Sequence, residues 1–223
     1  MSRLTPYHHG NLRAALVEAG MDLARAEGPQ SVVLREVARR VGVSHNAAYR
    51  HFADRDDLLL EIAGRAMALL SAAMRSHSAA VPEDVDAITR GRWRLQAIGR
   101  AYVEFALAEP GLFASAFSSF TGSRPPGRGV TPAEQELAAP FELLSSALDD
   151  LVTVGYLDAD RRQGAEVTCW AAVHGFAMLH LEGPLRGIEP DVRDDALATM
   201  LDTVDCGLGA PPDATLDRLV NDL

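Results

Sequence analysis

The side chains between positions 44 and 51 have the types and spacing that suit nucleic-acid recognition. The segment begins SHNAA, with short side chains that carry hydrogen-bonding groups, and continues YRH, whose longer side chains can reach phosphates. The major groove of B-DNA admits one α-helix, and residues near the start of that helix can contact base edges. The pattern therefore predicts DNA binding if this segment is helical and exposed on one side.

The preceding residues supply the element that would hold such a helix. Leu34, Val37, Ala38 and Val41 form one apolar stripe, which predicts a short helix that opens near Ser31. A second short helix would follow after a tight turn. This arrangement over 31–57 is typical of a helix-turn-helix, and a short helix pair with a purely structural role in an all-α protein is the alternative.

Turn and capping residues define the second helix. Gly42 stands where a positive φ is wanted, and Ser44 can cap a helix over about 45–52. Phe52 would bury inward, and Asp54 can cap the helix that follows. We therefore expect the 44–51 segment to be short, exposed and anchored at both ends.

The rest of the chain also has helical periodicity and lacks an alternating strand pattern, which predicts an all-α fold of about nine helices. The further helices are expected over 12–27, 54–76, around 93–105, 113–120, 132–154, 160–182 and 191–208. Asn11 would cap the first of these, and Asp158 or Asp160 would cap the helix over 160–182. The long helix around 93–105 would end before Pro110. Residues 121–131 are expected to form a loop. The expected domains are an N-terminal three-helix DNA-binding domain (1–53), a linking helix (54–75) and a larger helical domain (76–223).

The charge distribution fits this division of the chain. A net charge of −10 taken alone argues against a nucleic-acid partner. However, residues 1–53 hold seven Arg and four acidic residues, whereas the remainder holds 14 Arg and 27 acidic residues. Only the segment with the predicted recognition helix is basic.

Composition excludes several other classes of protein. No run of eighteen apolar residues exists, so no transmembrane helix is expected, and the N-terminus has no apolar signal core. Two cysteines make no disulfide framework, and a reducing cytoplasm is the expected setting. No phosphate loop, HExxH motif or nucleophile elbow occurs, and we expect no enzyme, cofactor or metal site. His8 and His9 have no nearby Cys, Asp or Glu to complete a metal site. A contact of this N-terminal arm with DNA is the open alternative for the two histidines.

Three segments resemble the DNA-binding domain of the TetR (tetracycline-repressor-like) family: YHHGNLR at 7–13, LREVARRVGVS at 34–44 and YRHFADRDDLL at 49–59. A fourth, CWAAVHGFAMLHLEG at 169–183, resembles the Trp…His-Gly motif of one C-terminal domain class of that family. The resemblance implies a homodimeric transcriptional regulator, a repressor rather than an activator, which binds a palindromic operator. A small apolar effector would release it. The alternative is a helical small-molecule-binding protein without operator function.

The resemblance also implies roles for individual residues. The start of the second helix would contact bases, its later residues would contact phosphates, and the helix after it would move when the effector binds. Asn46 can pair with adenine and His45 with guanine, and a capping role alone is the alternative for Asn46. Arg55 stands where the family usually has Lys. Arg35 would reach a base or a phosphate, and a solvated surface position is the alternative for Arg50. The expected DNA-binding residues are Arg35, Ser44, His45, Asn46, Ala47, Tyr49, Arg50, His51 and Arg55.

The C-terminal part would dimerise and bind the effector. The resemblance implies that helices 160–182 and 191–208 pair with their copies, and Gly175 with Ala171, Ala172 and Ala177 would allow a close approach. Trp170, His174 and Met178 step by four along one helix face, so they would line a pocket together, and packing in the core is the alternative. His174 would bind the effector or satisfy a neighbouring carbonyl. The expected effector-binding residues are Trp93, Tyr102, Phe105, Phe113, Phe117, Phe141, Trp170, His174 and Met178.

Overall fold

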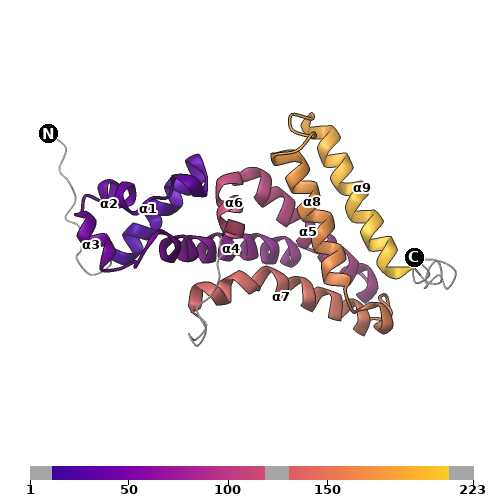
Figure 1. Ribbon diagram of the computed structural model, residues 1–223. Helices are drawn as coiled ribbons and strands as arrows, with labels where there is room; N and C mark the ends of the chain where they lie inside the picture. The colour runs from indigo at the N-terminus through magenta and orange to yellow at the C-terminus, as the bar shows by residue number, and fades with distance from the viewer. Residues whose placement is uncertain (1–11, 119–130, 211–223) are drawn as a thin grey trace, which may run out of the picture. The chain divides into compact units, whose positions relative to one another are not determined.

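The described part of the chain is entirely helical. The computed structural model describes residues 12–118 and 131–210 (Figure 1). These residues form nine α-helices and two short 3₁₀ helices, with no strand among them, which confirms the expected all-α class. No helix among them is long and apolar enough to cross a membrane. The expected cap Asn11, the arm with His8 and His9, and most of the 121–131 loop lie outside the described residues.

The helices belong to two compact units. The first holds the chain up to Ala72 together with Phe105–Pro140, and the second holds Ala73–Glu104 and the chain from Phe141 onward. Three helices, α4 (Arg55–Ala79), α5 (Ala87–Ala108) and α7 (Pro132–Thr153), contribute residues to both units.

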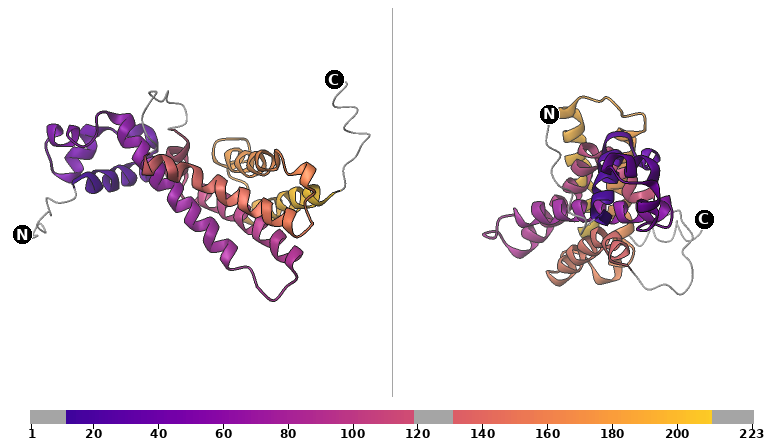
Figure 2. Two further views of the ribbon diagram at one scale, coloured as in Figure 1. Left: turned by 90° about the horizontal axis from the view of Figure 1, so that it is seen from below. Right: turned by 90° about the vertical axis from the view of Figure 1, so that its left-hand side faces the viewer.

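In the first unit, three short elements pack against the beginning of α4. These are α1 (Leu12–Glu27), α2 (Leu34–Val41) and α3 (His45–Tyr49), which lie close together in Figures 1 and 2. Burying each large apolar side chain contributes about 1.5–3 kcal/mol, so one shared core accounts for their association. Its fully or almost fully buried members include Leu16, Leu23, Val37, Ala48, Phe52, Leu58 and Ile62.

Three expected helix boundaries in this unit are wrong, one of them the start of the helix expected over 113–120, which begins at Pro110. The helix expected near Ser31 begins at Leu34, because Ser31 lies in a 3₁₀ turn (Pro29–Ser31) whose hydroxyl donates to Leu23 O and Gly28 O at 3.1 and 2.7 Å. The serine therefore closes the preceding turn and caps nothing. The second helix ends at Tyr49, earlier than expected, and the chain then continues as a turn.

α6 (Pro110–Ser118) completes the first unit by packing against the end of α1. A Cβ atom added at Gly111 would lie 2.1 Å from Ala24 O, so only glycine permits this approach of the two backbones. An ion pair between Arg25 Nε and Glu109 Oε2 at 2.9 Å joins the same two parts of the chain. The three-helix end of the protein is therefore packed against a further helix of its own unit.

In the second unit, α8 (Ala165–Leu181) lies beside α9 (Pro190–Gly209), as Figure 1 shows. The α7 part of this unit ends before Gly155, whose φ of 75° breaks the helix. Leu148, Leu151 and Leu157 are almost completely buried. These leucines supply much of the core on the α7 side of the unit.

The expected start of α8 is wrong by several residues. Asp158 caps only a short 3₁₀ turn (Ala159–Arg161), accepting from Asp160 N at 2.8 Å, and α8 begins at Ala165. The backbone explains the delay, because Gly164 adopts φ 83°, outside the helical range, directly before α8. The intervening Arg162 bonds to Asp149 and Glu166 at 2.7 and 2.5 Å, which holds this segment against α7.

A buried charge pair links α5 to α9. Asp205 is only 1% exposed, and its Oδ2 accepts from Arg92 Nε and Nη2 at 2.9 and 2.7 Å and from Gln96 Nε2 at 3.2 Å. The Arg92 guanidinium also lies 4.8 Å from the centre of the Tyr156 ring. A buried carboxylate needs such partners, since an unpaired one would be strongly destabilising.

Candidate nucleic-acid interface

The turn between α2 and α3 has the geometry that the sequence predicts. Gly42 adopts φ 78° and ψ 28°, the left-handed conformation that glycine accepts without strain, and its N–H donates to Arg39 O at 3.2 Å. Val43 N then donates to Ala38 O at 3.0 Å. Ser44 caps α3 by accepting from Ala47 N at 3.2 Å. These bonds fix the angle at which α3 leaves the turn.

α3 buries one side and exposes the other. Ala48 is completely buried against the core, and Phe52 beyond the helix end is buried as well. The opposite side carries exposed polar side chains from the helix and its flanking turns. The exposed residues are Ser44, His45, Asn46, Tyr49, Arg50 and His51, with Ala47 half-buried between them.

The rings of His45 and Tyr49 hold each other in place on this exposed side. Their centroids lie 4.5 Å apart at an interplanar angle of 87°, an edge-to-face contact between residues one helical turn apart. Tyr49 is 46% exposed, so its hydroxyl group remains accessible. The contact restricts both side chains before any ligand binds.

The arginines near α3 differ in whether an internal acid already neutralises them. Glu36 binds Arg39 through two bonds of 2.8 and 2.6 Å and Arg40 through one of 3.2 Å. Bonds from the Arg39 guanidinium, followed by those from Arg40, lower the pKa of Glu36 to about 2. By contrast, Arg35 and Arg50 are exposed and make no ion pair within the described residues. These two cations are free to meet an external anion.

Arg55 has an internal task that sequence reasoning missed. Its Nε donates to Val32 O at 2.9 Å and its Nη2 to Pro29 O at 2.7 Å, so it ties the start of α4 to the turn before α2. The Arg55 side chain is 42% exposed, and its Nη1 forms an ion pair with Asp56 Oδ1 at 3.7 Å. A phosphate contact of Arg55 stays a prediction.

Two further contacts position α3 through the start of α4. Asp54 accepts from Asp57 N at 2.9 Å while Asp57 accepts from Ala53 N at 3.1 Å, a reciprocal cap. Arg13 of α1 forms two 2.9 Å contacts with Glu61 and lies 4.7 Å from the centre of the Phe52 ring. Sequence periodicity could not indicate the Arg13 contact, because it joins residues far apart in the chain.

The nine residues expected to bind an effector are divided between the two units. Phe105, Phe113 and Phe117 belong to the first unit, where the Phe113 and Phe117 rings lie 5.0 Å apart. The other six belong to the second unit, where Phe141 and Trp170 lie 5.6 Å apart. Trp93 is 45% exposed and Met178 is half-buried on α8.

Tyr102 and His174 form the most buried polar contact in this set. Tyr102 Oη lies 2.8 Å from His174 Nδ1, so within the chain this nitrogen has a hydroxyl partner, and an effector contact of His174 stays a prediction. Burial raises the pKa of the Tyr102 phenol and lowers the pKa of the His174 imidazole. Both shifts favour a neutral pair near neutral pH.

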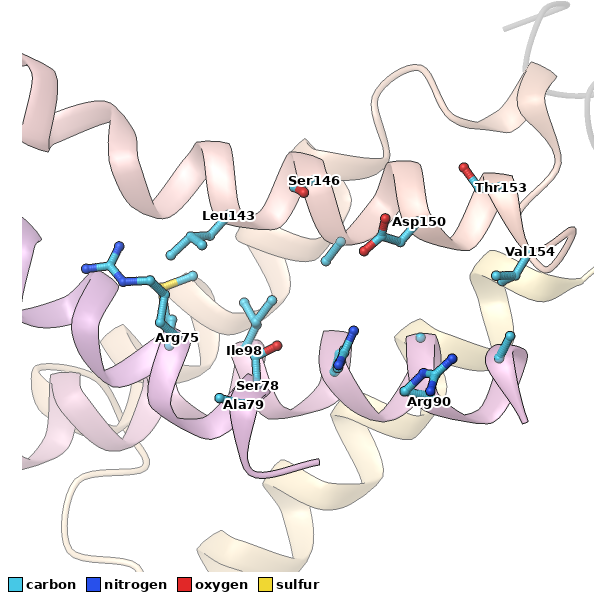
Figure 3. Close-up of a pocket in the computed structure, with 15 residues that line it drawn as sticks. Arg75, Ser78, Ala79, Arg90, Ile98, Leu143, Ser146, Asp150, Thr153 and Val154 are labelled. Carbon is cyan, nitrogen blue, oxygen red and sulfur yellow. The ribbon is translucent and has the colours of Figure 1, made fainter. Parts of the chain in front are cut away.

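The second unit contains a cavity of about 410 Å³ that sequence reasoning missed. Its lining comes from the end of α4, from α5 and from α7 (Figure 3). None of the nine expected effector-binding residues lines it. The described residues contain no cluster of three potential metal ligands.

Comparison with known families identifies both halves of the chain. Residues 16–62 match the family model described as "Bacterial regulatory proteins, tetR family", and residues 95–204 match that described as "Tetracyclin repressor-like, C-terminal domain". An uncharacterized HTH-type transcriptional regulator from Haemophilus influenzae is 44% identical over 64 residues. That match spans 28% of this chain and 31% of the relative.

Solved structures share the fold over most of the chain. A protein of unknown function from Rhodococcus sp. RHA1 is 28% identical with a TM-score of 0.75, covering 93% of this chain and 100% of its own. The TetR family transcriptional regulator PfmR from Thermus thermophilus is 17% identical, with a TM-score of 0.59 and coverage of 95% and 100%. A putative tetR family transcription regulator from Shewanella sp. PV-4 is 16% identical, with a TM-score of 0.57 and coverage of 86% and 96%. The last two likenesses concern the fold alone.

The family matches agree with the geometry of the first unit. One match contains α2, the glycine turn and α3, and the other extends over most of the second unit. Both point to transcription regulation, which is usually a non-enzymatic function. The chain belongs to the TetR family of transcriptional regulators.

Proposed function

We propose that this regulator is a homodimeric repressor that binds a palindromic operator through α3 and releases it when a small, largely apolar effector binds the C-terminal part. The observation that carries the proposal is the exposed side of α3, which presents hydrogen-bonding side chains while Ala48 and Phe52 anchor the opposite side. An α-helix held in this way fits the major groove.

The individual contacts support a division of labour on α3. Ser44 already makes the capping bond, and no hydrogen bond involves the Asn46 side chain within the described residues. Asn46 is therefore available to pair with adenine, and the ordered His45 ring to donate to guanine. We assign Tyr49 and Arg50 to phosphates, which fix position without selecting sequence.

We also assign phosphate contacts to His51 and Arg35. Arg55 is proposed to contact a phosphate in addition to its internal hydrogen bonds. All three side chains carry, or can carry, positive charge close to the exposed side of α3. Affinity that rests on such contacts falls steeply as the salt concentration rises. The half-buried Ala47 would allow close approach, because its small side chain leaves room for a thymine methyl group.

Apolar surface on α8 and α9 supports dimerisation. Val167 and Leu179 of α8 are 67% and 44% exposed, and Val192 of α9 is 58% exposed. A Cβ atom added at Gly175 would meet nothing within 4 Å, so no neighbour inside the chain requires this glycine. A helical glycine costs about 1 kcal/mol relative to alanine, and close packing against a second copy would offset that cost.

The small residues of α8 divide between this proposed interface and the core. Ala171 is exposed and Ala172 is half-buried, whereas Ala177 is completely buried within the chain. Ala177 is therefore a core residue, and the proposed close approach rests on Gly175, Ala171 and Ala172. A two-fold dimer would place its α3 helices in half-sites about 34 Å apart, or a multiple of that spacing.

The proposed domain division keeps 1–53 for DNA, 54–75 as the linking helix and 76–223 for effector binding and dimerisation. The unbroken helix α4, from Arg55 to Ala79, supports a linking role for 54–75. Effector binding would shift the population of dimers toward a half-site separation that no longer fits the operator. The effector must therefore bind the two populations with different affinity.

Footprinting on DNA that flanks the gene tests the proposal. We expect a protected palindrome whose affinity falls steeply with salt. His45→Ala and Asn46→Ala should relax preference at particular bases, whereas Tyr49→Phe and Arg50→Ala should weaken binding to all sequences alike. Arg39→Ala is the matched control for Arg50→Ala, since Glu36 already binds Arg39.

Two outcomes would contradict the proposal in different ways. Absence of protection at low salt, with the dimer intact, would remove operator binding and leave the small-molecule-binding alternative. Identical behaviour of the His45, Asn46, Tyr49 and Arg50 variants would leave DNA binding in place but refute the division between base and phosphate contacts.

A further inference from the structure

The cavity of the second unit has an apolar part. Met74 and Ile98, which are 3% and 6% exposed, line it together with Leu143 and Ala147. Figure 3 shows Ile98 from α5 and Leu143 from α7 on opposite sides of the space. A volume of about 410 Å³ is within the range of small-ligand sites. This part suits the hydrocarbon body of a small molecule.

The same cavity is lined by three arginines. Arg75 comes from α4, and Arg90 and Arg94 come from successive turns of α5. Asp150 of α7 is the one acidic residue in the described lining. Arg75 makes no ion pair within the part of the chain that the structure describes, so the lining has an excess of positive charge.

Two of these arginines already hold a carboxylate. Arg94 Nη2 lies 2.7 Å from Glu83 Oε1, and Arg90 Nη1 lies 3.1 Å from Glu83 Oε2. Glu83 belongs to the segment between α4 and α5, and its side chain is 73% exposed. Arg90 and Arg94 are 29% and 34% exposed, so the two guanidinium groups are better shielded than the acid they bind.

This arrangement shows what the arginine pair can bind. Guanidinium groups bind carboxylates through charge-assisted hydrogen bonds, and these bonds strengthen where water is partly excluded. Glu83 contributes its carboxylate and a backbone carbonyl that accepts from Arg90 Nη1 at 3.1 Å, and its side chain does not fill the apolar part of the cavity, since Glu83 is not among the lining residues. A carboxylate with an apolar body would satisfy both parts at once.

We propose that the cavity binds an amphipathic carboxylate whose headgroup replaces the Glu83 carboxylate between Arg90 and Arg94 and whose hydrocarbon chain packs against Met74, Ile98 and Leu143. As an effector site this rests on the proposed function, but the binding reaction itself does not require DNA. The effector would then be an anion with an apolar tail.

Decanoate and decanol, titrated into the full chain by calorimetry, test the site. Decanoate should bind and the uncharged alcohol should bind much more weakly. Arg94→Gln should lower decanoate affinity about tenfold, because it removes a charge-assisted bond to the headgroup. Glu83→Gln should raise decanoate affinity several-fold, because it removes the internal competitor. Asp202→Asn is the matched control, since it removes one exposed acidic charge from α9.

The opposite signs separate ligand binding from a structural role. Both variants remove the same Glu83–Arg94 ion pair, so a role confined to holding the fold would shift decanoate affinity in the same direction. Changes in the same direction, equal binding of decanol, or no binding of decanoate to the folded chain would overturn the proposal.

The operator complex distinguishes this proposal from the proposed function. Decanoate should release the chain from its operator, and Arg94→Gln should require about tenfold more decanoate for release. Binding without release would keep the carboxylate site and overturn its effector role. Failure to bind any operator would refute the proposed function while the calorimetric result stands.

Discussion

Arg55 offers the sharpest test of how the DNA-binding end is held together. The structure gives it two backbone acceptors, Val32 O and Pro29 O, which join the start of α4 to the turn before α2. Arg55→Ala removes both bonds, and Arg55→Lys keeps the charge but lacks the planar fork that reaches both carbonyls. We therefore expect both variants to be less stable than the native chain.

The size of the effect follows from the two bonds. A hydrogen bond to a charged group contributes about 1.5–3 kcal/mol when buried. Arg55 is 42% exposed, so solvent screening reduces its share, but Val32 is completely buried and its carbonyl would lose its partner. We expect Arg55→Ala to lower the free energy of unfolding by about 2 kcal/mol and Arg55→Lys by about 1 kcal/mol.

Urea unfolding followed by far-ultraviolet circular dichroism measures this change directly. Arg50→Ala is the control, because Arg50 is exposed and makes no ion pair within the described residues. It should change stability by less than about 0.5 kcal/mol while weakening DNA binding. An Arg55→Ala chain as stable as the native one would refute the reasoning and leave a phosphate contact as the role of Arg55.

Three further predictions concern charge. Glu36→Gln should release the two arginines it binds, so that non-specific DNA affinity rises and its salt dependence steepens; unchanged affinity in a filter or anisotropy titration would contradict this. Burial lowers the pKa of His174, so the folded chain binds fewer protons than the unfolded chain below the ordinary histidine pKa of about 6.5. The free energy of unfolding should therefore fall as pH drops below that value, and His174→Gln should flatten the fall; an equal slope would argue against it. Arg92→Leu should cost about 3 kcal/mol, since it strands the buried carboxylate of Asp205, and Arg92→Leu with Asp205→Leu should recover much of the loss; failure of this rescue would show that the pair does not act as a unit.

The helices and the exposed side of α3 were predictable because both depend on local chemistry. Periodicity along α2 and the glycine turn are encoded within a few residues, and so is the Ser44 cap. Ala48 and Phe52 then face the core as their spacing requires. Local pattern was sufficient wherever neighbours in sequence make the decisive contacts.

The wrong helix boundaries have a common cause. Ser31 could cap a following helix but instead bonds backward to Leu23 and Gly28. Asp158 caps only a short turn, because Gly164 with φ 83° interrupts the helix, and Arg162 between them binds Asp149 of α7. In both places a contact formed elsewhere in the fold decides between two locally acceptable structures.

The missed site residues follow the same rule. Arg55 binds carbonyls that precede it by more than twenty residues, and Arg13 meets Glu61 on another helix. The spacing of Arg90 and Arg94 could have indicated one basic side of α5, but nothing local indicated the cavity. Aromatic residue type proved a poor guide to that cavity, since none of the expected aromatics lines it.

The most direct test of the central claim is the dependence of operator affinity on half-site spacing. Once footprinting has located the palindrome, inserting about five base pairs between its halves turns one half-site to the opposite side of the duplex. A dimer whose two α3 helices are related by a two-fold axis should then lose most of its affinity for the operator. Inserting a full helical turn of DNA should return both half-sites to the same side of the duplex. Affinity that does not change with a half-turn insertion would contradict recognition by a symmetric dimer.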